Sequence, residues 1–231
     1  MTGKVKIGCC GFPVGRRQYL AALQVVELQQ TFYSPPPLDT ARPRREEAPP
    51  DFEFTLKAWQ LITHEVSSPT YRRLKRALSP EERHQAGSFQ DTPVVRAAWE
   101  TIGELAGALK ARLVVFRARP ALPPTAENIA RLRRFFSEVP RDRLAFAWES
   151  RGGPGPGRRW RPWTLLPPHL FQDALPASAC TGWEATGIRI QNRTSQPWLA
   201  WRRAYAMFNN LSMWTDARRF QEALGRSAAP G

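Results

Sequence analysis

Short apolar runs alternate with helical segments along the first 150 residues. Apolar runs that read as strands occupy residues 4–12, 25–32, 52–59, 112–117 and 144–149, with a further strand at 204–210. Helical patterns occupy residues 17–23, 39–48, 93–111 and 125–139, with a further helix at 216–224. This alternation indicates parallel βαβ units.

Polar residues follow several of these strands at the point where each one ends. They are Gln29–Thr31, Lys57, Glu149 and Asn209–Asn210. In a (β/α)8 barrel the carboxyl ends of the strands carry the chemistry. A doubly wound open sheet also alternates, but it more often has a glycine-rich first turn, and Gly11-Phe-Pro-Val-Gly15 is not that fingerprint. The pattern therefore predicts an α/β fold with a TIM-barrel-like (β/α)8-type barrel.

The stretch from residue 60 to 90 is mostly polar and is too long for an ordinary connection, so we expect it to be a functional loop. No apolar run approaches the roughly 18 residues that cross a membrane. The first residues, MTGKVKIGCCGF, lack the apolar region and cleavage site of a secretory signal. We therefore expect a cytoplasmic protein that has no membrane partner and no evident protein partner.

The chain has three cysteines, at positions 9, 10 and 180. Adjacent residues of a strand point to opposite faces, so Cys9 and Cys10 do not pair with each other. Metal-ligand spacings such as CxxC are absent. We expect one buried thiol and one half-exposed thiol.

The net charge is +14, and the cations are 29 arginines and five lysines. Basic clusters occur at residues 42–45, 72–76 and 131–134. They have two interpretations, a surface that faces the phosphates of a nucleic acid, or solvated helix faces. The clusters fall on different helices and need not share one face.

Four residues form a set that a barrel mouth could use for acid–base chemistry, namely Glu27, Lys57, His64 and Glu149. Lys57 could hold a phosphate, or burial could lower its pKa. Glu27 lies inside a strand and could instead belong to a buried ion pair. His64 could instead be a solvated loop histidine. The spacing points to no metal, and no cofactor can be named.

Five motifs occur in order: VELQQTFYSPP, FEFTLKAWQLITHE, LVVF followed by PTAENI, AWESRG, and AYAMFNN followed by DARRF. Together they resemble the domain-of-unknown-function 72 family, also called YecE-like, over residues 4–152 and 203–225. The resemblance implies one TIM-barrel-like domain over residues 1–231. The family's activity is not established, and its barrel is similar to those of sugar isomerases and apurinic endonucleases.

The resemblance carries the family's polar positions onto this chain. The expected catalytic residues are His64, Glu149 and Lys57. The expected substrate-binding residues are Glu27, Gln29, Thr31, Tyr33, Arg151, Asn209 and Asn210, and Phe32 and Thr63 are also matched.

The interval of residues 153–201 departs from the family, because a strand ending in Asp-Pro and a strand reading Tyr-Phe-Arg-Leu-His-Gly are both missing. The interval holds five of the nine tryptophans and seven of the 22 prolines, but only two acidic residues. Reading the coding DNA from each third base turns Trp163-Thr164 into an aspartate codon that proline can follow. Residues 177–195 then permit Phe-Arg-Leu-His-Gly and a glycine- and tyrosine-rich loop. We infer that the interval is translated out of frame and that strands 6 and 7 are missing or disrupted.

Two functions remain open. One is an enzyme, phosphodiesterase-like, that acts on a phosphorylated or nucleic-acid substrate at the barrel mouth and is impaired in this chain. The other is a non-catalytic barrel that binds nucleic acid through its basic surface.

Overall fold

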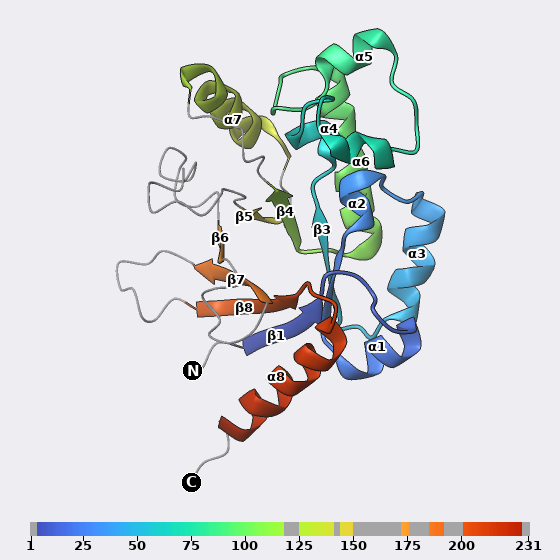
Figure 1. The fold of residues 1–231 in the computed structure, drawn as a ribbon, viewed down its shortest axis with the longest axis vertical. Helices are drawn as coiled ribbons and strands as arrows, with labels where there is room; N and C mark the ends of the chain where they lie inside the picture. Colours follow the sequence, from blue (N-terminus) through green and yellow to red (C-terminus); the bar gives the residue numbers. More distant parts are fainter. Residues whose placement is uncertain are drawn as a thin grey trace.

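The computed structural model describes residues 4–117, 125–140, 144–149, 172–175, 185–191 and 201–227, with side chains for 5–117, 125–140, 144–149 and 205–223. Strands and helices alternate along most of this chain (Figure 1). The strands are β1 (Lys4–Cys9), β2 (Val25–Leu28), β3 (Glu53–Lys57), β4 (Leu113–Arg117), β5 (Ala145–Glu149), β6 (Gln172–Leu175), β7 (Ala185–Gln191) and β8 (Trp201–Phe208). The helices are α1 (Arg16–Ala22), α2 (Gln30–Tyr33), α3 (Leu38–Glu47), α4 (Gln60–Thr63), the 3-10 turn η1 (Pro69–Arg73), α5 (Pro80–Gln85), α6 (Pro93–Leu109), α7 (Ala126–Glu138) and α8 (Met213–Ser227).

The eight strands pair in sequence order, and β8 pairs with β1 to close a barrel. Strands β1 to β6 run parallel to one another, and β8 runs parallel to β1. Strand β7 is antiparallel to both of its neighbours. The predicted TIM-barrel-like fold is confirmed. Its seventh position is disrupted rather than empty, because a reversed strand fills it.

Two sequence expectations are wrong in detail. The second strand ends at Leu28, and Gln30–Tyr33 form a short helix rather than the end of that strand. The stretch from residue 60 to 90 is not an irregular loop, because it contains α4, η1 and α5. Ser79 begins α5 with a capping box, in which its hydroxyl accepts from the Glu82 amide and its own amide donates to the Glu82 carboxylate.

Helices α1, α3 and α6 lie on the outer side of β1 to β4, and α8 packs against β1 and β8 (Figure 1). The main core lies between these helices and the sheet, and a smaller core fills the barrel interior. Both cysteines at the end of β1 are buried, Cys9 in the outer core and Cys10 in the inner one. The expectation of a half-exposed thiol is therefore wrong, since a barrel strand is covered on both faces.

Candidate active site at the carboxyl ends of the strands

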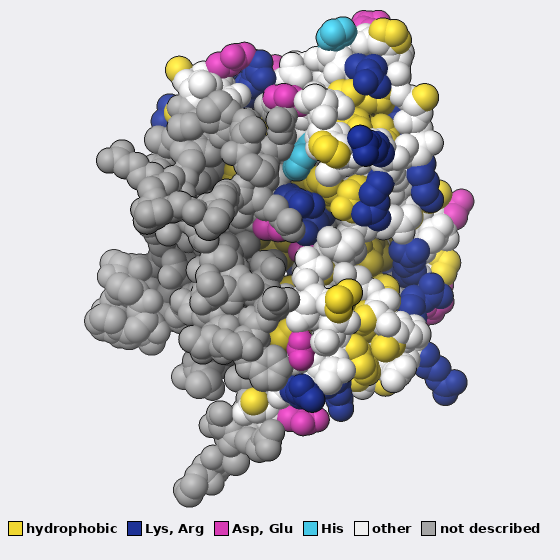
Figure 2. All heavy atoms as spheres, viewed as in Figure 1, with side chains coloured by type: hydrophobic (Ala, Val, Ile, Leu, Met, Phe, Trp, Pro, Cys, Tyr) yellow, Lys and Arg dark blue, Asp and Glu magenta, His cyan; other side chains and the backbone are white. Residues whose placement is uncertain are grey.

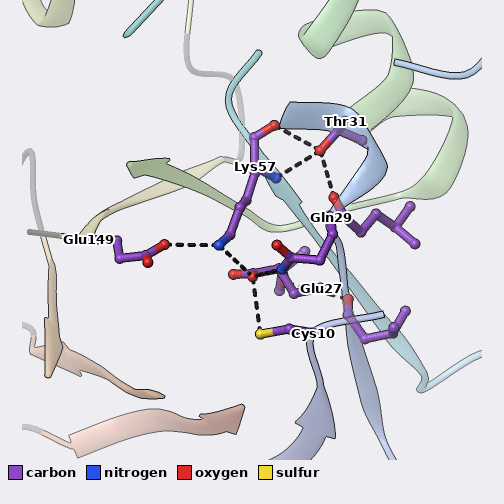
Figure 3. Close-up of polar contacts among 9 residues, drawn as sticks. Cys10, Glu27, Gln29, Thr31, Lys57 and Glu149 are labelled. Carbon is purple, nitrogen blue, oxygen red and sulfur yellow. Dashed lines mark hydrogen bonds and ion pairs between the residues drawn. The ribbon is translucent and has the colours of Figure 1, made fainter. Parts of the chain in front are cut away.

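Parallel pairing brings the carboxyl ends of four strands to one end of the barrel. Lys57, Arg117 and Glu149 are the last residues of β3, β4 and β5, and Cys10 directly follows β1. Arg117 stands opposite Glu149 in the β4–β5 register. Glu27, one residue before the end of β2, reaches the same interior (Figure 3). We call this end of the barrel the mouth.

A lysine lies between two carboxylates at the centre of the mouth. Lys57 Nζ lies 2.9 Å from Glu149 Oε2 and 3.3 Å from Glu27 Oε1 (Figure 3). The side chains of Lys57 and Glu27 are almost fully buried, whereas that of Glu149 is 14% exposed. The charged triad therefore meets the outside of the barrel through Glu149.

Two opposing effects act on the protonation of Lys57. Burial alone would lower its pKa, but the negative charges of Glu27 and Glu149 outweigh burial and raise the pKa above its ordinary value. The expectation that burial lowers the pKa of Lys57 is therefore wrong. The lysine stays an ammonium, so it supplies a fixed positive charge and not a base.

The carboxylate of Glu27 is held by three groups. Its Oε1 accepts from Cys10 Sγ at 3.3 Å, from Lys57 Nζ and from Gln29 Nε2. Burial, followed by the charge of Glu27, raises the pKa of the Cys10 thiol well above its ordinary value, so the thiol stays protonated and donates. Glu27 is thus the partner in a buried ion pair, which is the alternative that its place inside a strand suggested.

Cys10 is a mouth residue that the sequence analysis did not include. Its signal was available, because it directly follows a strand, as the predicted polar residues do. Thr31 acts one layer behind the triad, where its hydroxyl accepts from the Lys57 amide at 2.9 Å and lies 2.8 Å from the carbonyls of Leu28 and Lys57. Thr31 therefore ties the ends of β2 and β3 together and is fully buried.

His64 is 5% exposed, so it is not a solvated loop histidine. Its Nδ1 lies 2.7 Å from Thr63 Oγ1, and its ring meets Phe32 edge to face at 4.9 Å between centroids. The backbone carbonyl of His64 accepts from the Tyr71 hydroxyl at 2.7 Å. Contacts on both the ring and the backbone thus fix the position of this imidazole.

The backbone of His64 also packs tightly against Gly87. A Cβ on Gly87 would lie 1.9 Å from the His64 carbonyl oxygen, and Gly87 has a φ of +81°. We expect Gly87→Ala to lower the free energy of unfolding by about 2–4 kcal/mol, because both the clash and the backbone angle oppose a side chain. Urea unfolding measures this change.

Gly107→Ala is the matched control for Gly87→Ala. Gly107 lies inside α6, and a Cβ there meets no atom within 4 Å. We expect this variant to gain about 1 kcal/mol from helix propensity. Equal stability of the two alanine variants would contradict the tight packing at His64.

Two arginines stack on aromatic rings beside His64. The guanidinium of Arg73 lies 3.6 Å from the centroid of the Tyr33 ring, and that of Arg117 lies 5.3 Å from the Phe32 ring. Arg117 Nε is buried without a hydrogen-bond partner among the described residues. A stacked guanidinium keeps its N–H groups at its edge, where they can bind oxyanions. Neither arginine was among the predicted site residues.

The remaining predicted residues are less central. Asn209 and Asn210 follow β8 at the mouth end, where the Phe208 carbonyl accepts from the Cys10 amide at 2.8 Å. Asn210 Nδ2 donates to Asp216 Oδ2 at 2.8 Å, so this amide joins β8 to α8. Arg151 lies outside the described residues. Within the described ranges, no group of three His, Cys, Asp or Glu side chains could hold a metal ion.

The family model for "Protein of unknown function DUF72" matches residues 15–152, which is more than half of the chain. The protein belongs to this family of TIM-barrel-like proteins. No curated protein shows significant sequence similarity to the chain.

Solved structures agree with this assignment. A DUF72 family protein from Enterococcus faecalis V583 matches with a TM-score of 0.59 and 16% identity over 96% of this chain and 98% of that chain. A DUF72 family protein from Thermotoga maritima MSB8 matches with a TM-score of 0.46 and 18% identity over 73% and 63% of the two chains. Endonuclease IV from Thermus thermophilus reaches a TM-score of 0.30 and 13% identity over 62% and 51%, and we base no argument on it. Among the described residues, no helix is long and apolar enough to cross a membrane.

Proposed function

We propose that the mouth is the active site of a hydrolytic, phosphodiesterase-like enzyme whose substrate carries a phosphate. The observation that carries this proposal is the ammonium of Lys57 between the carboxylates of Glu27 and Glu149. Buried ion pairs stabilise a fold only weakly, because both charges lose their hydration. A charged triad at the strand ends is therefore better explained by chemistry than by stability, and the fold places chemistry at this end.

Each group of the triad has a distinct part in this proposal. Glu27 anchors the lysine, and Lys57 supplies a permanent positive charge beside Glu149. Glu149 is the member that reaches the opening, so it is the general acid or base. His64 is the second acid–base candidate, since its ring is fixed against Phe32.

The phosphate of the substrate requires donors that are not already neutralised. Lys57 already contacts two carboxylates, whereas the stacked guanidinium groups of Arg73 and Arg117 form no ion pair within the described part of the chain. The proposal therefore assigns the phosphate to these arginines. Exposed cations on and after η1, namely Arg72 and Lys75, extend the positive charge beyond Arg73.

Glu149→Gln tests the enzymatic proposal with bis(p-nitrophenyl) phosphate as the probe. We expect kcat to fall by about 100-fold or more, because the amide cannot exchange a proton. The release of p-nitrophenol measures the rate. Glu104→Gln on the exposed face of α6 is the matched control and should keep the full rate. Equal rates for the two variants would contradict the role of Glu149.

A second candidate function rests on the exposed arginines, which Figure 2 shows as dark blue side chains over η1, α3 and α1. Under this proposal the protein binds nucleic acid without acting on it. Binding of a labelled single-stranded oligonucleotide should then fall steeply with salt and survive Lys57→Ala and His64→Ala. Filter binding across salt concentrations, together with the hydrolysis rates, separates the two functions.

A further inference from the structure

Helices α6 and α7 enclose a pocket that is separate from the mouth. Its volume is about 290 Å³, and none of Glu27, Lys57, Arg117 and Glu149 lines it. This volume suits a molecule of one or two rings, since binding pockets for larger ligands begin at roughly 300 Å³. The residues that line it are Phe89, Gln90, Asp91, Val95, Arg96, Trp99, Glu100, Gly103, Arg134, Phe135, Glu138, Val139, Pro140 and Leu144.

Three aromatic rings form the inner wall of the α6–α7 pocket. The Phe135 ring meets Phe89 at 5.3 Å and Trp99 at 5.9 Å between centroids, both edge to face. Trp99 Nε1 donates to the Pro140 carbonyl at 3.2 Å, so its polar group is already bonded. Such a wall offers dispersion and apolar area to a ligand, and apolar cavities hold water poorly.

The charges at the rim of the pocket are paired with one another. Arg134 Nη1 lies 3.3 Å from Asp91 Oδ2, and Arg96 forms an ion pair with the other oxygen of Asp91. Arg134 also lies 4.0 Å from Glu138. Since these cations are matched by acids on the same rim, the pocket favours an uncharged ligand.

The segment that places Phe89 in this wall has an uncommon backbone conformation. Ser88 and Phe89 have φ values of +51° and +54°, in the left-handed region. The Phe89 amide donates to the Ile62 carbonyl at 2.8 Å, and Ser88 Oγ donates to Glu65 Oε1 at 3.2 Å. Backbone strain of this kind persists where its surroundings impose it and is common around ligand sites.

From the rings, the paired rim and the strained wall, we infer that the α6–α7 pocket binds a small, uncharged ring compound. This inference does not depend on the chemistry of the mouth. Gly103 provides a sharp test, because it lines the pocket and a Cβ there meets no atom within 4 Å. A leucine at this position fills the pocket without a clash at its Cβ.

The probe is 4-fluorotoluene, and its binding is followed by fluorine NMR during titration with the full chain. We expect saturable binding with a Kd on the order of 1 mM or tighter. Gly103→Leu should weaken binding at least about 10-fold. Gly107→Leu is the matched control, since Gly107 lies one turn further along α6, does not line the pocket and also has open space at its Cβ.

The outcomes decide the inference in either direction. Binding to the wild type and to Gly107→Leu, but not to Gly103→Leu, supports the site, provided that circular dichroism shows equal folding of the variants. Absence of saturable binding to the wild type overturns it. Equal affinity of both leucine variants also overturns it, because the probe then binds elsewhere.

Discussion

Lys57→Met should lower the free energy of unfolding by about 3–5 kcal/mol. The substitution removes the cation and leaves the buried carboxylate of Glu27 beside the partly buried Glu149. The side chain of Glu27 is 4% exposed, so water cannot replace the lost partner. Urea unfolding at neutral pH measures the change.

Lys75→Met is the control for this substitution, because Lys75 is exposed and forms no ion pair within the described ranges. We expect it to change stability by no more than about 0.5 kcal/mol. Lys57→Arg retains the charge and should lose less than Lys57→Met. A loss below about 1 kcal/mol for Lys57→Met would show that Glu27 does not depend on this cation.

The pH dependence of wild-type stability has a definite sign at Lys57. The folded protein raises the pKa of this lysine above its unfolded value, so the folded state favours the protonated form. Its contribution is fully present below the unfolded pKa of roughly 10.4 and is lost as the pH rises above that value. The stability difference between wild type and Lys57→Met should therefore stay level from about pH 7 to 9 as far as Lys57 is concerned.

The reading frame of residues 153–201 carries the other large expected effect. We expect the coding DNA, read from each third base of this interval, to encode Asp-Pro and then Arg-Leu-His-Gly. Restoring that frame should raise the melting temperature by about 10 °C or more, because a parallel seventh strand would replace the reversed one. The antiparallel pairing of β7 with both neighbours, in a barrel whose other strands are parallel, agrees with this hypothesis.

Sequencing the coding DNA tests the hypothesis directly, and differential scanning calorimetry measures the effect on stability. A stop codon in the offset frame would exclude the frame change, as would the absence of the Asp-Pro codons. A chain in which the interval is replaced by a scrambled segment of equal length is the control. If this chain melted as high as the restored one, the gain would not come from the restored strands.

The sequence predicted much of the mouth. Glu27, Lys57 and Glu149 were expected together, because polar residues end three neighbouring strands and a parallel barrel brings such ends to one place. The partners within the set were not predictable. Ion pairing depends on side-chain directions and on distances of a few ångströms, and neither follows from spacing along the chain.

The residues that sequence reasoning missed have specific physical reasons. Cys10 was treated as an inert thiol, but the barrel closes over it and places Glu27 3.3 Å away. Arg73 lies in the stretch expected to be a loop, and only the fold of η1 brings it over Tyr33. Such contacts join segments that are far apart along the chain.

The sequence by itself determined the barrel, since apolar periodicity and polar strand ends are local patterns that backbone geometry converts into parallel βαβ units. It also determined which carboxylates and lysine would reach the mouth. Only the tertiary structure decided the protonation of Lys57, because burial and two carboxylates act on it in opposite directions and their balance depends on distance. The α6–α7 pocket likewise belongs to the tertiary structure, since its walls come from side chains of two helices and the segments beside them.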